Sequence, residues 1–299
     1  MRITIEGREM TNNNQEKNRV LPKTLYLVAT PIGNLADMGE RALKVLSEVD
    51  FIAAEDTRNT LRLLTHFGIS KTLVSYHEHN KREKGEEIAS RLLAGESCAL
   101  VTDAGTPAVS DPGEDLVKLC AERGINVTSV PGACAFVTAL ILSGLSTERF
   151  VFEGFLPVTK KERRERLELL SGETRTFILH EAPHKLRNTL SDLVKTFGEY
   201  RKIAICRELT KLNEEIFRTT LGEAESFYDE HEPRGEYVLV IEGGNNIQTK
   251  RNNEIAGMSV EDAVEYYISK GLSKNESIKR VAKEMGFSRN DVYNRMIER

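Results

Sequence analysis

The sequence Asp103-Ala-Gly-Thr-Pro-Ala-Val-Ser-Asp-Pro-Gly113 follows directly on the apolar run Cys98-Ala-Leu-Val-Thr102. The apolar run predicts a buried strand, and the glycines, prolines and hydroxyls after it predict a structured loop. Such a loop is unfavourable to order without a use, because glycine loses the most backbone entropy and each proline lacks an amide donor. In an open α/β sheet, ligands bind just beyond the carboxyl ends of the strands. The stretch therefore predicts a ligand-binding loop, although residues 110–113 also fit a turn in which Asp111 caps a helix over 114–122 and Pro112 enters its first turn.

Short β-rich runs alternate with amphipathic stretches on both sides of this loop. Strands are predicted at 25–29, 51–54, 73–76, 98–102 and 126–130, with helices at 40–49, 81–93, 114–122 and 136–142. Alternation of this kind predicts βαβ units and a largely parallel sheet. The first half of the chain is therefore expected to be an α/β domain.

The pattern breaks around residues 142–147, and a second unit of strands and helices follows. Its predicted strands are 150–155, 176–180, 202–206, 214–219 and 237–242, and its predicted helices are 160–170 and 185–197. We expect a disordered polar arm (1–20), a parallel-sheet N-terminal α/β domain (21–145) and a mixed-sheet C-terminal α/β domain (146–245). A polar linker (246–256) and a small all-helical module (257–299) complete the chain.

Composition narrows the class of protein. The chain has 299 residues, of which 39% are hydrophobic, enough for two or three packed domains. The formal net charge of −4 does not indicate a nucleic-acid binder. The four cysteines, at positions 98, 120, 134 and 206, have no CxxC spacing, which argues against a disulfide framework and favours a reducing cytoplasm. No apolar run approaches the length of a membrane span.

The segment His180-Glu-Ala-Pro-His184 has the spacing of the zinc-binding HExxH motif. That motif requires one helix, whereas Pro183 disfavours helix at Ala182 and would remove an interior hydrogen bond. We predict a strand end, a turn, and a helix that Pro183 opens. His77 and His79 have no evident third ligand, so no metal site is predicted.

Two more loops resemble the first in chemistry. They are Thr30-Pro-Ile-Gly-Asn-Leu-Ala-Asp37 and Val130-Pro-Gly-Ala-Cys-Ala135, and each follows a predicted strand. Small residues let backbone groups approach a flat ligand closely, although tight packing of helix on sheet explains the last loop equally well. A dinucleotide site is disfavoured, because a GxGxxG turn needs three glycines and the first loop has one.

The sequences of these loops resemble those of the tetrapyrrole-methylase superfamily and, within it, of the ribosomal RNA small subunit methyltransferase I family. The resemblance covers residues 25 to 243. Its motifs are Ala29-Thr-Pro-Ile-Gly-Asn-Leu35, Glu55-Asp-Thr-Arg58, the stretch 103–113, Val130-Pro-Gly132, Gly154-Phe-Leu-Pro157, His180-Glu-Ala-Pro-His184, Arg207-Glu-Leu-Thr-Lys211 and Gly235-Glu-Tyr-Val238.

The resemblance implies a two-domain methyltransferase that binds S-adenosylmethionine between its domains. It further implies methylation of the ribose 2′-hydroxyl of a cytidine in small-subunit (16S) ribosomal RNA, and a homodimer. The superfamily's porphyrin enzymes carry a GxGxGD first loop, which residues 30–35 lack, and this departure favours RNA over a tetrapyrrole.

The expected cofactor contacts are main-chain groups of the three loops, together with second-domain residues near the adenine. They are Pro31, Ile32, Gly33, Asn34, Asp103, Ala104, Gly105, Thr106, Pro107, Ser110, Pro131, Gly132, Ala133, Phe155, Glu181, Gly235, Glu236 and Tyr237.

A ribose hydroxyl is a weak nucleophile, and a carboxylate that removes its proton would add roughly 10²–10⁴-fold in rate. Glu55, Asp56, Asp103 and Glu181 are all predicted at strand ends. Glu55 and Asp103 are the candidate catalytic bases. Asp56 fits the N-cap of a helix over 59–67 best.

Basic residues around the site are the candidates for RNA phosphate contacts. They are Arg58, Arg62, Lys160, Lys161, Arg207 and Lys211, with Arg163 and Arg164 beside them. The run 160–166 is mixed in sign, so a solvated helix face explains it equally well.

The last forty residues match the pattern of a helix-turn-helix. Ala282 is at the position of the small residue, Gly286 at that of the turn glycine, and Val292 at that of the apolar contact on the second helix. Ser288 would cap that second helix. Nucleic-acid contact and a packing or dimer-stabilising role both remain open.

Three functional classes therefore compete: an RNA 2′-O-methyltransferase, a small-molecule methyltransferase of the tetrapyrrole type, and a ligand-sensing helix-turn-helix regulator.

Overall fold

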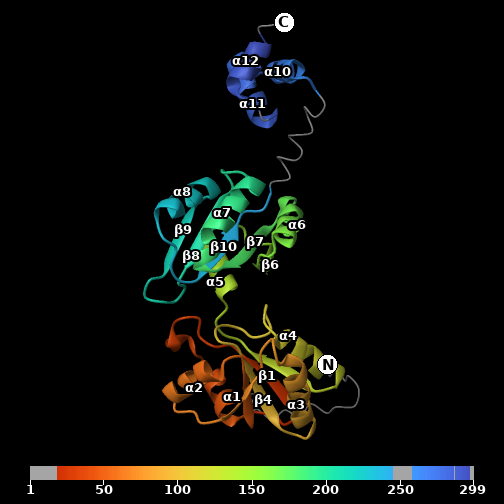
Figure 1. The fold of residues 1–299 in the computed structure, drawn as a ribbon, viewed down its shortest axis with the longest axis vertical. Helices are drawn as coiled ribbons and strands as arrows, with labels where there is room; N and C mark the ends of the chain where they lie inside the picture. Colours follow the sequence, from red (N-terminus) through yellow and green to blue (C-terminus); the bar gives the residue numbers. More distant parts are fainter. Residues whose placement is uncertain (1–18, 245–257, 286, 297–299) are drawn as a thin grey trace, which may run out of the picture.

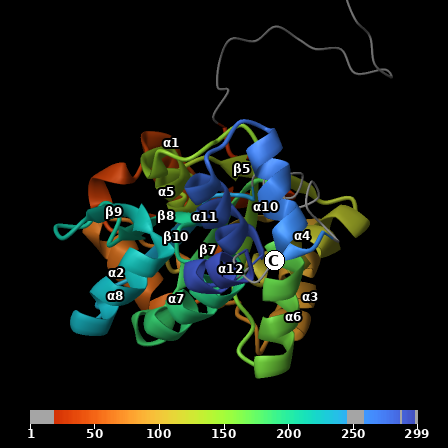
Figure 2. The same cartoon turned by 90° about the horizontal axis from the view of Figure 1, so that it is seen from above.

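The protein is described from a computed structural model, which covers residues 19–244, 258–285 and 287–296. Two five-stranded sheets are followed by a group of helices at the C-terminal end (Figure 1). The side view and the view from above agree that α2 and α8 lie on one side of the molecule and that α3, α4 and α6 lie on the other (Figures 1 and 2). The predicted α/β architecture is confirmed.

The first sheet is wholly parallel, as predicted. Its strands are β1 (Thr24–Val28), β2 (Phe51–Ala54), β3 (Thr72–Ser75), β4 (Ser97–Val101) and β5 (Asn126–Val130), in the order β3-β2-β4-β1-β5. Helices α1 (Glu40–Glu48) and α2 (Thr57–His66) cover one face, and α3 (Lys81–Leu93) and α4 (Gly113–Glu122) cover the other. Burial on both faces explains why residues 98–101 of β4 are an unbroken apolar run.

The strand order creates a switch point between β1 and β4. From β1 the chain crosses to β2 on one side, and from β4 it crosses to β5 on the other. Loops that leave adjacent strands in opposite directions open a crevice at the carboxyl ends, where ligands bind in doubly wound sheets. The loop of residues 102–112 leaves β4 at this point.

The second sheet is mixed. Its strands are β6 (Phe150–Phe155), β7 (Thr176–Glu181), β8 (Lys202–Arg207), β9 (Glu215–Thr220) and β10 (Tyr237–Ile241), in the order β6-β7-β10-β8-β9. Only β6 and β7 pair in parallel within this sheet, so the predicted excess of antiparallel pairing is confirmed. Helices α6 (Lys160–Ser171), α7 (Pro183–Phe197) and α8 (Leu221–Glu230) pack over one face.

Helix α5 (Ala135–Ser143) follows the last strand of the first sheet but packs on the second. Its Ala139 and Leu140 share a buried cluster with Ile178 of β7 and Val240 of β10. The guanidinium of Arg218, on β9, donates to the carbonyl of Leu142. The helix therefore ties the two sheets together, and the domain boundary at 145/146 stays a prediction.

The C-terminal helices are α10 (Val260–Ser269), α11 (Lys274–Met285) and α12 (Arg289–Arg295). They share a core that includes Ala282 and Val292. The hydroxyl of Ser288 accepts a hydrogen bond from the amide of Asp291, which confirms it as a cap of α12. Gly286, residues 1–18 of the predicted arm (1–20) and the predicted linker 246–256 lie outside the described residues. Within the described ranges, no helix has both the length and the apolar character needed to cross a bilayer.

Candidate active site

The loops after β1 and β4 are joined directly. Thr30 and Gly105 exchange two main-chain hydrogen bonds, of 2.9 and 3.0 Å, and the hydroxyl of Thr30 donates to the carbonyl of Thr102. Gly105 has a φ of +85°, a left-handed conformation that residues with a Cβ rarely adopt. Main-chain groups of two sequence-distant loops are thereby held at the switch point.

The loop after β5 is held against the other two. The hydroxyl of Thr106 donates to the carbonyl of Ala133 at 2.9 Å. A Cβ at Gly132 would lie 2.8 Å from the Cβ of Ala29, so only glycine lets the chain pass there. The structure therefore brings the three predicted loops together at one edge of the first sheet.

The second half of the β4 loop is strained and anchored. Ala108 and Ser110 both have positive φ, of 65° and 62°, although neither is glycine. The carboxylate of Asp111 accepts hydrogen bonds from the amides of Ala108, Val109 and Gly113. The predicted cap is therefore displaced by one residue: the N-cap of α4 is Pro112, and Asp111 fastens the turn before it.

The two candidate bases lie on neighbouring strand ends. Glu55 accepts a hydrogen bond of 2.8 Å from the hydroxyl of Thr102. Asp103 is exposed and accepts longer hydrogen bonds, of 3.2 Å from the amide of Asp56 and 3.4 Å from the side chain of Asn59. Both carboxylates are thus oriented by the loops, and that of Asp103 also faces solvent.

Asp56 has the capping role that the sequence predicts. It is the N-cap of α2, where it accepts from the amide of Arg58 and pairs with that guanidinium at 2.7 Å. These contacts lower the pKa of Asp56 to about 2. Its carboxylate is committed to the helix end and to Arg58.

A loop and a strand of the second sheet contact this edge. A Cβ at Gly33 would overlap Cγ of Lys211 and would lie 2.8 Å from the hydroxyl of Thr210. A Cβ at Gly154, which has a φ of +65°, would lie 3.1 Å from the hydroxyl of Ser110. The first-sheet loops therefore meet the second sheet at two points where only a hydrogen occupies the Cβ position.

The loop that meets Gly33 carries an ion-pair network. Lys211 donates to carboxylate oxygens of Glu208 and Glu236, at 2.9 and 3.0 Å, and Glu208 also accepts from the amide of Glu236. The left-handed Gly235 lies against the Glu208 side chain. Lys211, a predicted RNA contact, is therefore engaged within the protein, and Arg207 likewise pairs with Glu215.

Alternation along β7 separates two adjacent polar residues. His180 follows Ile178 on the face covered by α5, between the rings of Phe152 and Phe155. Its Nε2 is buried without a hydrogen-bond partner among the described residues, and burial lowers the pKa of this imidazole. The sequence places His180 in a motif but gives it no role in the site, although the period of two along the strand distinguishes it from Glu181.

Glu181 points to the opposite face. It is 5% exposed, and its carboxylate accepts from the amide of Ala182 and from the hydroxyl of Thr189. Tyr237 lies on that same face, where it is buried and accepts from the amide of Arg234. The structure therefore does not bring the side chains of Glu181 and Tyr237 to the edge where the loops gather. Phe155, by contrast, has an accessible side chain, because the residue is 59% exposed.

The zincin spacing at His180–His184 does not lie on one helix. Strand β7 ends at Glu181 and α7 begins at Pro183, as predicted. No cluster of three His, Cys, Asp or Glu side chains able to hold a metal ion occurs among the described residues.

The remaining predicted RNA contacts are exposed. Arg58 and Arg62 lie on α2, and Lys160 and Lys161 lie in the first turn of α6. The structure places them in two separate groups, one on each sheet unit.

Comparison with known proteins identifies the class of fold. The family described as Tetrapyrrole (Corrin/Porphyrin) Methylases matches residues 24–225. The uroporphyrin-III C-methyltransferase of Thermus thermophilus, solved in complex with S-adenosyl homocysteine, superposes with a TM-score of 0.52 at 17% identity, over 73% of this chain and 97% of that one. The fold is that of a tetrapyrrole methylase.

Sequence relatives narrow this class. Ribosomal RNA small subunit methyltransferase I of Halalkalibacterium halodurans is 49% identical over 271 residues, which are 91% of this chain and 93% of that protein. The protein of the same name from Synechocystis sp. is 45% identical over 274 residues, 92% of this chain and 97% of its own length. The chain belongs to the ribosomal RNA small subunit methyltransferase I family of tetrapyrrole methylases. It is a methyltransferase that uses S-adenosylmethionine.

Proposed function

We propose that the protein methylates the ribose 2′-hydroxyl of a cytidine in 16S ribosomal RNA. The observation that carries this proposal is the 45–49% identity to proteins named ribosomal RNA small subunit methyltransferase I over nine tenths of the chain. The first loop supports it, because residues 30–35 lack the glycines of a GxGxGD turn and Gly33 packs against Lys211 instead.

The cofactor would lie between the gathered loops and the second sheet. The residues fit such a ligand, since Ala104, Pro131 and Gly132 are exposed and offer main-chain groups without bulky side chains. The other loop positions proposed as contacts are Pro31, Ile32, Gly33, Asn34, Asp103, Gly105, Thr106, Pro107, Ser110 and Ala133. Phe155, Gly235 and Glu236 remain candidates from the second sheet.

Two of the sequence-based candidates change role in this proposal. Glu181 is left out, because both its oxygens are occupied on the far face of β7. Tyr237 is kept for its main chain only, because its ring is buried on that same face. His180 takes the place of Glu181 as the polar side chain of β7, because it faces the α5 side.

When bound, S-adenosylmethionine supplies an electrophilic methyl group on a sulfonium. The protein then has to hold the ribose oxygen in line with that group and remove its proton, and alignment alone supplies much of the rate. Asp103 is the better placed of the two candidate bases, because it is exposed and its hydrogen bonds are long enough to rearrange. Glu55, which accepts a hydrogen bond from the hydroxyl of Thr102, would orient the β4 loop or serve as the base itself.

RNA would approach along exposed cations of both units. Arg58, Arg62, Lys160 and Lys161 are the proposed phosphate contacts, and the C-terminal helices are a further candidate for nucleic-acid contact. Arg207 and Lys211 are proposed as contacts only if RNA displaces their carboxylate partners. A homodimer in the cytoplasm remains part of the proposal.

The test is incorporation of label from S-adenosyl[methyl-³H]methionine into 30S subunits and into naked 16S RNA, with uroporphyrinogen as the small-molecule control. Digestion to nucleosides and mass spectrometry should find the methyl group on a cytidine ribose. Label on a base, or on the porphyrinogen alone, would contradict the proposal.

A further inference from the structure

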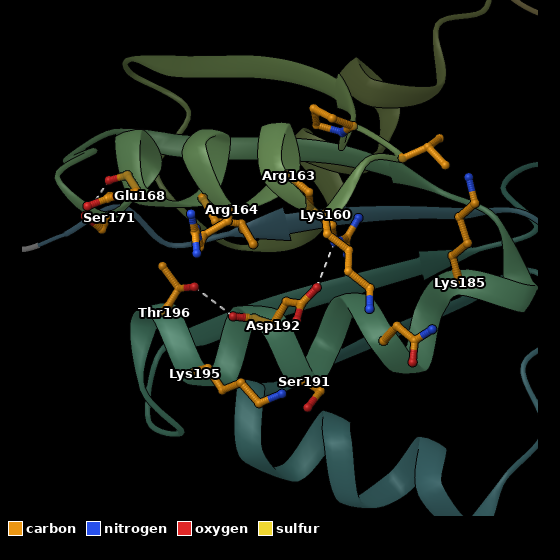
Figure 3. A pocket seen from close by; sticks show the side chains of 14 residues that line it. Lys160, Arg163, Arg164, Glu168, Ser171, Lys185, Ser191, Asp192, Lys195 and Thr196 are labelled. Atoms are coloured by element: carbon orange, nitrogen blue, oxygen red, sulfur yellow. Dashed lines mark hydrogen bonds and ion pairs between the residues drawn. The ribbon is translucent and has the colours of Figure 1, made fainter.

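Helices α6 and α7 leave a groove between them on the outer face of the second sheet (Figure 3). Its volume is about 1040 Å³. Five basic side chains line it: Lys160, Arg163 and Arg164 from α6, and Lys185 and Lys195 from α7. The groove is therefore cationic on both walls, in a protein whose net charge is −4.

One of these cations holds the two helices together. Arg163 is 15% exposed and donates to the carboxylate of Asp192 at 2.7 Å and to the hydroxyl of Thr189 at 2.8 Å. This pair neutralises Asp192, one of two acids in the lining. The other acid, Glu168, lies beside Ser171 at one end (Figure 3).

The other four cations have no carboxylate within ion-pair distance among the described residues. These four are Lys160, Arg164, Lys185 and Lys195. Other cations of the same unit do have acidic partners, since Arg166 pairs with Glu153 and Arg175 pairs with Glu173. Unpaired cations that face one another repel. An anionic partner would relieve that repulsion.

Helical spacing builds both walls. Lys160 and Arg164 are four residues apart, so they lie on one face of α6, together with the buried Leu167, which also lines the groove. On α7, Lys185, Asn188, Ser191 and Lys195 follow one another at intervals of three or four, opposite the buried Leu186, Leu190 and Leu193. The α7 wall is a continuous polar stripe about two to three turns long.

We propose that this groove binds the sugar-phosphate backbone of the RNA substrate outside the target nucleotide. The inference rests on the proposed function. No aromatic side chain lines the groove, so it offers charge and hydrogen bonds to phosphates but no ring on which a base could stack. Pro157 and Val158 at the groove come two and three residues after Phe155, so the groove begins next to the proposed site.

The critical variant is Lys185→Gln combined with Lys195→Gln. Loss of two phosphate contacts should lower the slope of log affinity against log salt by about 1.4 to 1.8 and weaken binding to 16S RNA about tenfold at low salt. KM for the RNA should rise by a similar factor with kcat unchanged, because such contacts act equally in the ground and transition states.

The matched control removes two positive charges from the first unit, with Arg41→Gln and Lys44→Gln on α1. Affinity for S-adenosylmethionine and the melting temperature should be unchanged in both double variants. If the double α7 variant loses stability, the single Lys195→Gln variant, exposed on the last turn of the stripe, gives the same comparison.

The groove proposal fails if the α7 variants bind and methylate RNA as the α1 control does, while the wild type remains active on RNA. The proposed function then still stands. A wild-type protein that neither binds nor methylates small-subunit RNA overturns both proposals.

Discussion

Thr30 and Gly105 pair through two main-chain hydrogen bonds across the point where β1 and β4 end. The two residues are 75 positions apart, yet this short antiparallel bridge fixes one loop to the other. A loop held by its main chain can present its remaining amides and carbonyls to a ligand without reordering. Preorganisation of this kind reduces the entropy lost on binding.

Gly105→Ala should weaken cofactor binding. A residue with a Cβ at a φ of +85° is strained by about 1–2 kcal/mol, and the new Cβ would lie 3.3 Å from Ile32. Calorimetry should show about tenfold weaker binding of S-adenosyl homocysteine. Gly124→Ala is the control, since Gly124 has a φ of +62° in open space. It should lose similar stability and keep full affinity, and equal affinity in the two variants would disprove the role of the bridge.

Gly33→Ala should disturb the contact between the two sheet units. The added methyl group would overlap Lys211 and Thr210 and approach the carbonyl of Leu209 within 3.0 Å. We expect a loss of about 1–3 kcal/mol in stability, as in overpacked sites, and a lower kcat/KM. Gly39→Ala, in the same connection but with no atom within 4 Å of the new Cβ, should leave kcat/KM unchanged and should lower stability less, through the poorer N-cap of α1 alone. Thermal melts and single-turnover methylation measure the two effects.

Asp103→Asn should nearly abolish activity. The amide keeps the shape of the carboxylate but cannot take up a proton at neutral pH, so the rate should fall by about 10²–10⁴-fold if Asp103 is the base. Single-turnover rates at saturating S-adenosylmethionine separate this effect from weaker cofactor binding. Glu55→Gln is measured in parallel, and a larger fall in that variant would transfer the role to Glu55.

The stability of the fold should depend on His180 below neutral pH. Burial lowers the pKa of this imidazole below its ordinary value of 6.5, so the unfolded chain takes up a proton more readily than the folded one. The stabilising contribution of the neutral ring is present above pH 6.5 and declines as the pH falls from there toward the lowered pKa. Melting temperatures between pH 8 and pH 5 should fall more steeply for the wild type than for His180→Phe. Parallel curves would show that the ring is protonated equally in both states.

Only one of the four thiols should react quickly in the native protein. Burial raises the pKa of Cys120 to about 11 and of Cys206 to about 12, and it also raises the pKa of Cys98. All four cysteines are free, and Cys134 alone is partly exposed. Because the thiolate is the reactive form, Ellman's reagent at pH 8 should release one equivalent before unfolding and four after it. Cys134→Ser should remove the fast equivalent.

Local sequence patterns were sufficient to predict both sheets, because every observed strand begins and ends within one residue of its predicted bounds. They do not predict α8, since Leu221–Glu230 is acidic and has Gly222 in its first turn. That helix depends on the buried Leu221, Ala224 and Tyr228 and on the cap at Thr220. The strand order and the packing of α5 on the second sheet rest on contacts between residues far apart in the sequence.

The candidate site was predictable to a similar degree. The three loops could be found because glycine, proline and hydroxyl residues follow three strands that end at one edge. Side-chain direction was the weaker part. Glu181 and His180 are adjacent in the same motif, yet one faces α7 and the other faces α5. A motif compared as a string of letters carries no such information, whereas alternation along the strand does.

Helix α5 gives the two sheet units a common core, since its buried residues are contributed by one half of the chain and covered by the other. The second half therefore lacks part of its apolar interior when it is separated from the first, and the first half then exposes the apolar face of α5. Melting should consequently be a single cooperative event across residues 24–241, and a gene divided at the apparent boundary should yield a second half that precipitates unless the first is co-expressed.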